Sequence, residues 1–222
     1  TRPGSEPISK EEEIKRVIPV ISEIAKRFSV PISVDTYKSE VAKAALDSGA
    51  TMVNDISGLK FDTEMVNIVS SRKAYVIIMH MKGTPKTMQD NPQYENVVKE
   101  IKQFLQTQIE YAIKSGIERE KIFIDPGIGF GKITEHNLQI LHNIQEFKSI
   151  GGVDQRIAIG TSRKSFIGRI LGSETKPIPA EERLFGSIAT YVWLVLQAVK
   201  ILRVHDVQET NEAIKVITEI QN

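Results

Sequence analysis

The sequence contains no cysteine. This absence excludes disulfide bonds, thiolate nucleophiles and zinc sites built on thiolates. A net excess of charge is also missing, because 29 lysines and arginines stand against 28 aspartates and glutamates. No general electrostatic field therefore favours nucleic acid or an acidic membrane surface, and any anion must be bound by a local group of residues.

Long apolar runs are absent as well. The longest run, residues 192–199, is interrupted by Gln197, and a bilayer span needs roughly 20 apolar residues. The sequence also begins without the pattern of a signal peptide. We therefore expect a soluble, cytoplasmic protein whose partners are small molecules, with neither nucleic acid nor membrane among them.

The sequence does contain a regular alternation of strand and helix patterns over its 222 residues, enough for one α/β domain with an ample core. Strands are expected at residues 30–34, 51–56, 74–79, 122–124, 156–159 and 201–204. Helices are expected at residues 9–28, 39–48, 62–71, within 91–115, at 134–150, in a short run ending at 171, and at 180–199 and 209–221.

Such alternation indicates a parallel sheet, which is built either as a (β/α)8 barrel or as an open, doubly wound sheet. All six expected strands end in polar residues: Asp35, Asn54, His80, Asp125, the turn 160–164, and Arg203 with His205. A barrel gathers the ends of many strands around one mouth, whereas an open sheet binds its ligand at one switch point. We therefore predict a TIM (β/α)8 barrel as a single domain over residues 1–222.

The predicted barrel has six strands where eight are needed, and a complete barrel typically has about 250 residues. The sequence thus predicts that two N-terminal βα units are missing. It also predicts that two edges of the sheet are bare.

The stretch KIFIDPGIGFGK, residues 121–132, has the form of a binding site. Its apolar strand leads Asp125 directly into a turn that contains three glycines, Gly127, Gly129 and Gly131. Glycines permit backbone angles closed to other residues and let a ligand approach closely. Alternatively, Asp125 caps a tight turn between strand and helix.

A carboxylate accepts bidentately from two adjacent N–H donors, so Asp35, Asn54 and Asp125 together suit a flat heterocycle with amino and amide edges. Each alone is more typical of a cap or a turn. His80, between two methionines, is more typical of a packed histidine than of a ligand. No spacing of histidine and carboxylate residues indicates a metal site made by the protein alone.

Two further segments suit an anion. The turn GTSRKS, residues 160–165, combines hydroxyls and two cations at an expected helix start, although it also fits a solvated first helical turn. Arg203 and His205 are two positions apart and so face the same side of a strand. They suit a diphosphate, unless either one forms an ion pair with Asp206 or with a carboxylate at the end of a helix.

Taken together, these motifs resemble those of dihydropteroate synthases, which join a dihydropterin to 4-aminobenzoate in folate biosynthesis. The resemblance runs from end to end and is carried by TRPGSEP, VDTYKSEVAKAAL, GATMVNDISG, MHMKGTPKTMQ, DPGIGFGK, GTSRKSFIG and RVHDV. It implies a pterin-binding (β/α)8 barrel that condenses (7,8-dihydropterin-6-yl)methyl diphosphate with 4-aminobenzoate. The products are 7,8-dihydropteroate and diphosphate.

The resemblance also assigns roles to residues, with Asp125, Lys164 and Asp35 as the catalytic group. It implies a pterin site made by Asp35, Asn54, Met79, Asp125, Gly160, Lys164 and Arg203. It implies a diphosphate site made by Thr1, Arg203 and His205. It implies a 4-aminobenzoate site made by Arg2, Pro3, Phe130, Lys164 and Ser165.

The same resemblance implies Mg²⁺ as a cofactor, held in the family by an asparagine from the N-terminal loop that is missing here, so that no metal ligand is expected in this chain. It further implies a homodimer. The apolar helix 180–199, which includes Trp193, is then either a core helix or the dimer face. Because a barrel without its first two strands should not close, the resemblance assigns activity to a full-length parent chain.

Three other functions fit parts of the sequence. A pterin-binding methyltransferase that serves a corrinoid shares the barrel, but Lys164-Ser165 and the MHMKGTP loop read as synthase features. A non-catalytic pterin-binding paralogue would bind a pterin without turnover. An unrelated aldolase-type barrel would need a Schiff-base lysine inside a strand, and none of the six expected strands contains one.

Overall fold

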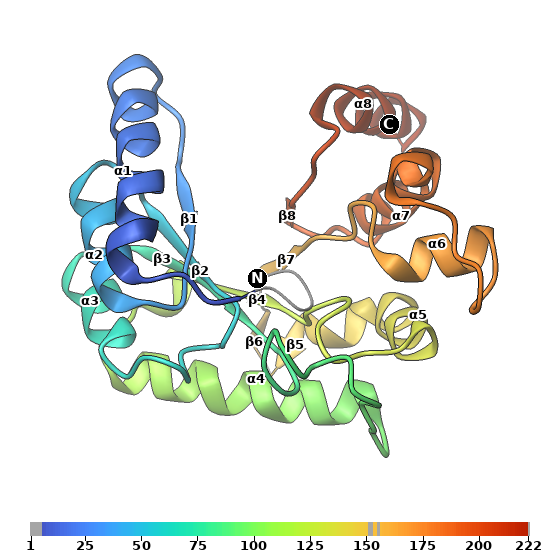
Figure 1. Ribbon diagram of the computed structural model, residues 1–222, viewed down its shortest axis with the longest axis horizontal. Coiled ribbons are helices and arrows are strands. Elements are labelled where there is room, and N and C mark those ends of the chain that lie inside the picture. The colour runs from blue at the N-terminus through green and yellow to red at the C-terminus, as the bar shows by residue number, and fades with distance from the viewer. Residues whose placement is uncertain (1–5, 151–152, 155, 222) are drawn as a thin grey trace.

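The computed structural model describes residues 6–221 apart from 151, 152 and 155, and its helices and strands alternate as expected (Figure 1). The strands are β1 (Ser33–Asp35), β2 (Met52–Asp55), β3 (Tyr75–Met79), β4 (Ile122–Asp125), β5 (Ser149–Ile150), β6 (Val153–Asp154), β7 (Arg156–Ile159) and β8 (Ile201–Leu202). The α-helices are α1 (Lys10–Arg27), α2 (Ser39–Asp47), α3 (Met65–Ser71), α4 (Val97–Lys114), α5 (Thr134–His142), α6 (Ser165–Leu171), α7 (Leu184–Leu196) and α8 (Val207–Gln221). Three short 3₁₀ helices are η1 (Arg119–Lys121), η2 (Ile144–Phe147) and η3 (Ala180–Arg183).

The main sheet has six parallel strands in the order β1, β2, β3, β4, β7, β8. Each strand is added beside the one before it, as in a barrel, whereas a doubly wound sheet reverses its direction of growth. The sheet curls, so that the edge strands β1 and β8 face each other across its open side (Figure 1). The predicted incomplete barrel of six strands is thereby confirmed.

The register of the sheet places the polar strand ends at one level. Asp35 lies opposite Asn54, and Met79 lies opposite Asp125. Beyond the last paired residues of β7 and β8, the backbone N–H of Arg203 donates to the carbonyl of Ile159 over 2.9 Å. The C-terminal ends of the strands therefore meet along one rim of the curled sheet.

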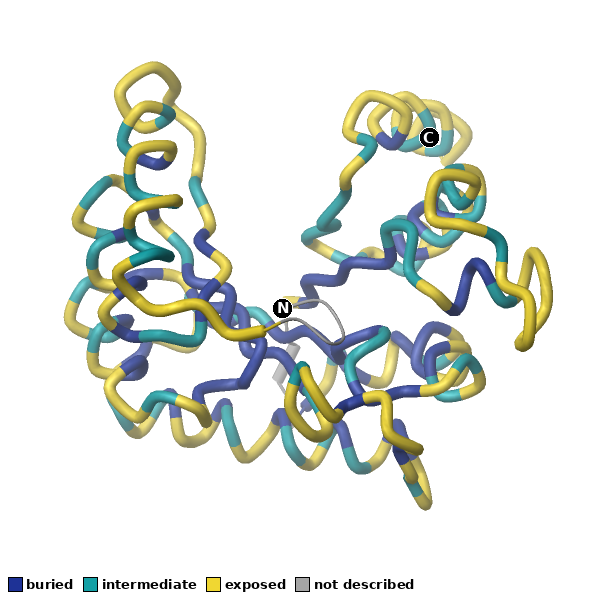
Figure 2. Tube along the Cα trace, viewed as in Figure 1, coloured by how far each residue is buried: buried dark blue, intermediate teal, exposed yellow. Residues whose placement is uncertain are grey.

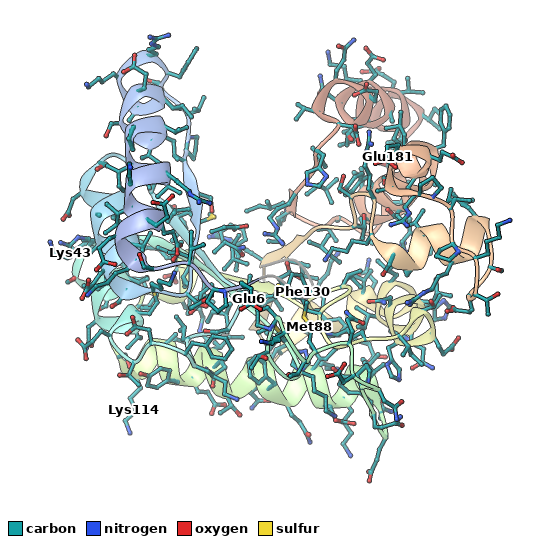
Figure 3. The ribbon with its side chains drawn as sticks, viewed as in Figure 1. Glu6, Lys43, Met88, Lys114, Phe130 and Glu181 are labelled. Atoms are coloured by element: carbon teal, nitrogen blue, oxygen red, sulfur yellow. The ribbon has the colours of Figure 1, made fainter. Side chains whose placement is uncertain are left out.

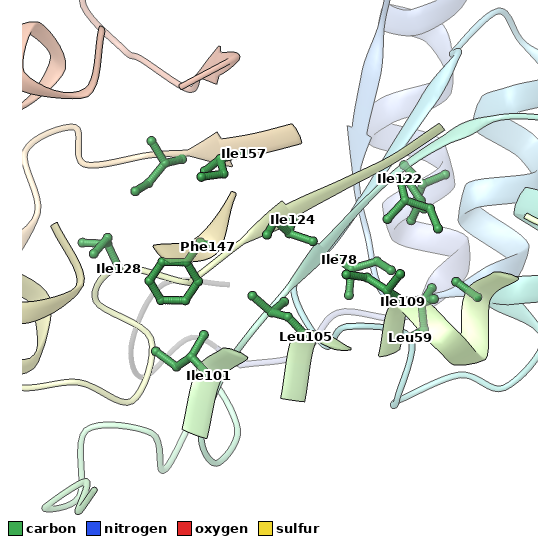
Figure 4. Packing of buried hydrophobic residues seen from close by; sticks show 14 of the residues in the cluster. Leu59, Ile78, Ile101, Leu105, Ile109, Ile122, Ile124, Ile128, Phe147 and Ile157 are labelled. Carbon is green, nitrogen blue, oxygen red and sulfur yellow. The ribbon is translucent and has the colours of Figure 1, made fainter. Parts of the chain in front are cut away.

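The core lies between the strands and the helices that cover them. In Figure 2 the central strands are mostly buried, whereas the covering helices alternate between buried and exposed residues. Ile78 and Ile124 project from neighbouring strands toward α4 (Figure 4). Helix α4 buries Ile101, Leu105 and Ile109, which are spaced four residues apart and so form one face of the helix. This packing fixes the strands whose ends carry the polar residues.

One expected helix ends earlier than the sequence predicts. The helix predicted over residues 134–150 stops at His142, is followed by η2, and gives way to a two-stranded antiparallel hairpin of β5 and β6. Asn143 is the C-cap residue of α5, where the backbone leaves the helical conformation, and its side-chain amide donates to the carbonyl of Gln139 over 2.8 Å. Ile144 and Phe147 continue the helical spacing of apolar residues, and both are fully buried although they lie in the 3₁₀ helix η2. This spacing explains why the sequence predicts too long an α-helix.

Two other boundaries also shift. The helix predicted over residues 180–199 begins as the 3₁₀ helix η3, and its α-helical part α7 ends at Leu196. Strand β8 pairs over Ile201–Leu202 alone and is shorter than predicted. None of the described helices combines the length and the apolar character needed to cross a membrane.

Candidate active site

Asp35 and Asn54 form a pair at the ends of β1 and β2. The side-chain amide of Asn54 donates to Oδ1 of Asp35. Asn54 is completely buried, whereas 58% of the Asp35 side chain is exposed. Oδ1 of Asn54 is buried and has no hydrogen-bond partner within the described part of the chain. An unpaired buried acceptor costs free energy, so a ligand that donates an N–H group to this oxygen would be bound favourably.

Asp125 lies at the end of β4, beside Met79 of β3, and both are buried. Its Oδ1 accepts from the backbone N–H of Gly127 over 2.7 Å. Its Oδ2 lies 3.5 Å from Nη2 of Arg203. The carboxylate is therefore held by the turn on one side and faces a cation on the other.

Arg203 extends from β8 across the concave side of the sheet. Nη1 lies 3.4 Å from both carboxylate oxygens of Asp35. Its Nε is buried and has no hydrogen-bond partner among residues 6–221 as the structure describes them. Gly160 lies directly beside this side chain, since a Cβ at that position would be in van der Waals contact with Cβ of Arg203 at 3.4 Å. The arginine thus joins carboxylates from β1 and β4 and keeps one donor unused.

The structure decides the alternative left open for Asp206. This carboxylate pairs bidentately with Arg163, at 3.0 Å from Nε and 2.5 Å from Nη2, and so it pairs with neither Arg203 nor His205. The ion pair holds the pKa of Asp206 below its ordinary value. His205 is exposed, and its backbone N–H donates to Oγ of Ser162 over 3.3 Å.

Lys164 precedes α6 and turns toward the glycine-rich turn after β4. Its Nζ donates to the carbonyl of Ile128 and lies 4.6 Å from the ring centroid of Phe130. Phe130 lies near the middle of the molecule (Figure 3). Ser165, the next residue after Lys164, is exposed and begins α6. Burial lowers the pKa of Lys164 to about 8; Asp125 opposes this shift and Arg203 adds to it.

Several of these residues line a pocket of about 510 Å³ at the rim of the sheet. Its lining residues are Ser33, Asp35, Gly160, Ser162, Lys164, Arg203, Val204 and His205. A larger hollow of about 850 Å³ lies over α4 and α5 and includes Lys99, Lys102 and Glu146. We place the site at the rim because strand ends converge there, whereas the larger hollow has none of the carboxylates or cations that end the parallel strands.

The structure thus brings together Asp35, Asn54, Asp125, Lys164 and Arg203. Met79 lies beside Asp125, while Gly160 and His205 line the pocket. The turn 160–165 fits the anion prediction only in part, since Arg163 is engaged by Asp206 and Thr161 is buried against Thr190. The predicted positions Thr1, Arg2 and Pro3 lie outside the described residues.

The sequence analysis missed Lys132, whose side chain is enclosed behind the glycine-rich turn. It also missed Arg163 in the role of holding its turn, with a left-handed φ of 52° and a backbone N–H bonded to Ser187. The position of Lys132 directly after three glycines was a usable signal. Its burial was not readable from the sequence, because lysine is normally exposed.

The expectation of a packed histidine is confirmed, since His80 is buried edge-on against Phe104, with ring centroids 4.9 Å apart.

This rim offers few side chains that are available to coordinate a metal ion. Within the described part of the chain, no three or more histidine, cysteine or carboxylate side chains gather closely enough to hold a metal ion. The Asp35 carboxylate is engaged by Asn54 and Arg203, and that of Asp125 by Gly127 and Arg203. These donors do not fit an Mg²⁺ ion held by the protein alone, which would take several free oxygen ligands.

Comparison with known proteins agrees with the geometry. The family model described as pterin binding enzyme matches residues 1–205. A dihydropteroate synthase of Synechocystis sp. is 42% identical over 216 residues, which are 97% of this chain and 72% of that protein. The Escherichia coli dihydropteroate synthase is 42% identical over 217 residues, which are 98% of this chain and 74% of that protein.

Solved structures of the same kind superpose closely. A Yersinia pestis dihydropteroate synthase bound to a sulfonamide drug has a TM-score of 0.92 and 37% identity, and covers 99% of this chain and 77% of its own. A Xanthomonas albilineans dihydropteroate synthase with 4-aminobenzoic acid has a TM-score of 0.90 and 38% identity, and covers 100% of this chain and 76% of its own.

Proposed function

The chain belongs to the pterin-binding enzyme family, as a member of the dihydropteroate synthase type, and from this premise we propose how its residues share the reaction. The function is the condensation of a dihydropterin methyl diphosphate with 4-aminobenzoate, a transferase step of folate biosynthesis. A single observation carries the residue assignment: among the residues that the structure describes, neither the buried oxygen of Asn54 nor the buried Nε of Arg203 finds a partner at this rim. Buried polar groups without partners point to a missing ligand.

The pterin ring binds among Asp35, Asn54, Met79, Asp125, Gly160, Lys164 and Arg203. The carboxylate of Asp125 accepts from the amino and amide edge of the ring, as a buried carboxylate does best with paired N–H donors. Asn54 Oδ1 takes a further N–H group. Gly160 and Met79 present surfaces against which a flat ring lies.

The diphosphate binds at the exposed end of the pocket. Arg203 and His205 supply donors there, with the hydroxyl of Ser162 beside them. By resemblance, Thr1 joins this group. We propose Mg²⁺ as the cation that accompanies the diphosphate; the described donors do not hold it alone, and no step below depends on it.

The 4-aminobenzoate binds beside Phe130, Lys164 and Ser165, with Arg2 and Pro3 assigned to the same site by resemblance. The Lys164 ammonium above the Phe130 ring provides a cation near the benzoate carboxylate. The two substrates then meet between the turn after β4 and the turn after β7.

The reaction breaks the bond between the pterin methylene carbon and the diphosphate oxygen, and the electron pair leaves with the diphosphate. The methylene cation is delocalised over the electron-rich ring, the arylamine nitrogen attacks it to form the C–N bond, and the resulting ammonium loses its proton to water. Asp35 and Asp125 stabilise the developing positive charge, while Arg203 and His205 stabilise the leaving anion. Catalysis rests on preorganised charge and on positioning of the amine, with Asp125, Lys164 and Asp35 nearest the reacting atoms.

The proposal is tested by measuring the intact mass of the protein together with diphosphate release in the presence of Mg²⁺. Release that requires 4-aminobenzoate and yields 7,8-dihydropteroate supports the assignment. Binding of the pterin without turnover indicates a non-catalytic paralogue. Transfer from methyltetrahydrofolate to a corrinoid indicates the methyltransferase. None of the described strands contains a lysine, so nothing in the sheet favours the aldolase alternative.

We also propose that the chain forms a homodimer in the cytoplasm through α7 and α8. Phe185 on α7 is 80% exposed and Val216 on α8 is 62% exposed. Both line an apolar hollow of about 550 Å³ between the two helices. A dimer that buries this face should dissociate when Phe185 is changed to Glu, which sizing chromatography detects; an unchanged elution volume would count against the interface.

Trp193 is a weaker probe of the dimer than the sequence suggested. It is 41% exposed, and its indole N–H donates to the carbonyl of Leu141 in the same chain over 3.0 Å. The Trp193→Asp change therefore removes an internal bond as well as an exposed surface. We expect Trp193→Asp to give monomers or insoluble protein. Phe185→Glu changes exposed surface without removing a side-chain hydrogen bond, so it separates the two causes.

A further inference from the structure

Lys132 is an enclosed lysine that the reaction described above does not use. It directly follows the glycine-rich turn, and only 1% of the residue is exposed. Its Nζ lies 3.0 Å from Nδ1 of His80 and 2.9 Å from the carbonyl oxygen of Phe130. Burial of an amine is unfavourable unless its hydrogen bonds are made. An apolar side chain of similar length would fill the same space without the free-energy cost of desolvating an amine. We therefore look for a function of the amine in the hydrogen bonds that it makes.

That function concerns the turn itself. Four consecutive carbonyls of the turn each accept from a side chain: Ile128 from Lys164, Gly129 from Gln89, Phe130 from Lys132, and Gly131 from Tyr94. Gln89 and Tyr94 come from the loop after β3, and Lys164 comes from the turn before α6. Lys132 alone among these four donors is completely enclosed, and it holds the turn from beneath.

The atoms on the inner side of the turn are packed too closely to admit an additional side-chain atom at Gly127. A Cβ on Gly127 would lie 1.9 Å from the carbonyl oxygen of His80 and 3.4 Å from Nζ of Lys132. The amine therefore lies between the end of β3 and the turn, and fixes the distance between them. His80 is held neutral, because burial and the neighbouring Lys132 lower its pKa to about 2.

Phe130 receives contacts on two sides. Lys132 bonds its carbonyl from inside, and the Lys164 ammonium lies 4.6 Å from the centroid of its ring. We infer that Lys132 is a positioning residue for the aromatic amine substrate, which acts by fixing the backbone of Phe130 so that its ring and Lys164 form the 4-aminobenzoate site. This inference rests on the proposed function and deepens it. Phe130 lies in the turn that Lys132 bonds directly, whereas the pterin residue Asn54 lies on β2, and Lys132 bonds His80 and Phe130 rather than that strand.

The test compares Lys132→Met with Lys121→Met. Lys121 is a matched control because its Nζ also donates to a backbone carbonyl, that of Lys73 over 2.8 Å, but at the opposite end of β4. Two equilibrium constants are measured for each protein: the Kd of the dihydropterin diphosphate alone, and the Kd of 4-aminobenzoate with diphosphate and Mg²⁺ present. Steady-state KM values for both substrates follow where turnover is observed.

Lys132→Met is expected to weaken 4-aminobenzoate binding about tenfold, the effect of one lost buried hydrogen bond, and to change pterin binding less than about threefold. Lys121→Met is expected to leave both unchanged. Equal losses for the two ligands, or no loss for 4-aminobenzoate, would overturn the inference. If Lys132→Met does not fold, Lys132→Gln, which keeps an N–H donor, decides the question by the same ratio of the two losses. Failure of the wild-type chain to bind either ligand would instead overturn the proposed function, and this inference with it.

Discussion

Arg203 and Asp35 meet across the open side of the sheet. Nη1 of the arginine lies 3.4 Å from Oδ2 of the carboxylate, although Asp35 ends one edge strand, β1, and Arg203 follows the opposite edge strand, β8. The same guanidinium reaches Asp125 through Nη2 at 3.5 Å. One cation thus links the first, fourth and last strands of the curled sheet.

Arg203→Lys is expected to lower kcat/KM for the pterin diphosphate by at least about 100-fold, because an ammonium replaces a planar fork that bonds two carboxylates and a ligand at once. Steady-state kinetics with varied pterin diphosphate measures the effect. Arg72→Lys is the control, since Arg72 pairs with Asp47 on the surface at 2.8 Å and lies outside the site. A loss at Arg203 no larger than at Arg72 would remove Arg203 from the assignment.

Asn54→Asp is expected to abolish measurable pterin binding. The change replaces the amide that donates to Asp35 with a carboxylate, and it places two anions side by side in a buried position. The free energy of unfolding should also fall by about 1–3 kcal/mol. Calorimetric titration with the pterin and urea unfolding measure the two effects, and Asn67→Asp on the exposed side of α3 serves as the control. Normal pterin affinity in Asn54→Asp would contradict the proposed ring site.

Affinity for the pterin diphosphate is expected to decrease as pH rises through about 8, the pKa to which burial lowers Lys164. Below this pH the folded protein carries a charged Lys164 beside Arg203, and above it the amine is neutral. Lys164→Met should bind more weakly at pH 7 and lack this alkaline decrease. A wild-type affinity that stays constant from pH 7 to about 9 would rule out the contribution of this charge.

The same group contributes to stability with a defined sign. Its pKa in the folded chain is about 8, against an ordinary value of 10.5. Between these values the unfolded state binds more protons, so the contribution of Lys164 to the free energy of unfolding increases with pH. Urea unfolding of wild type and Lys164→Met between pH 7 and 10 isolates this contribution, which should disappear in the variant.

Two glycine-to-alanine changes should separate folding from binding. Gly127 has a φ of 73°, and a Cβ there would lie 1.9 Å from the carbonyl oxygen of His80, so Gly127→Ala should lower the free energy of unfolding by more than about 2 kcal/mol. Gly160 lies outside the left-handed region, and its Cβ would lie 3.5 Å from Nε of Arg203. Gly160→Ala should therefore change stability by less than about 1 kcal/mol and weaken pterin binding. Thermal unfolding and pterin titration of both variants check this; the reverse order of effects would contradict it.

Much of the fold was predictable because it depends on local patterns. The spacing of Ile101, Leu105 and Ile109 predicts a helix, and α4 confirms it. The same rule failed after His142, because the buried Ile144 and Phe147 keep a helical spacing while the chain turns into a hairpin. Periodicity reports which side chains are buried, and an α-helix and a 3₁₀ turn can bury the same ones.

The sequence by itself determined the type of site in this protein. Parallel βα units place every strand end at one rim, so a polar residue after each strand is sufficient to predict a shared site. Only the tertiary structure decided which charges meet: Arg203 pairs with Asp35 and Asp125, while Asp206 pairs with Arg163. It also decided that Lys132 is enclosed beneath the turn. The physical reason is that ion pairing and burial depend on distances between segments far apart in the chain, which the curl of the sheet sets and no local pattern encodes.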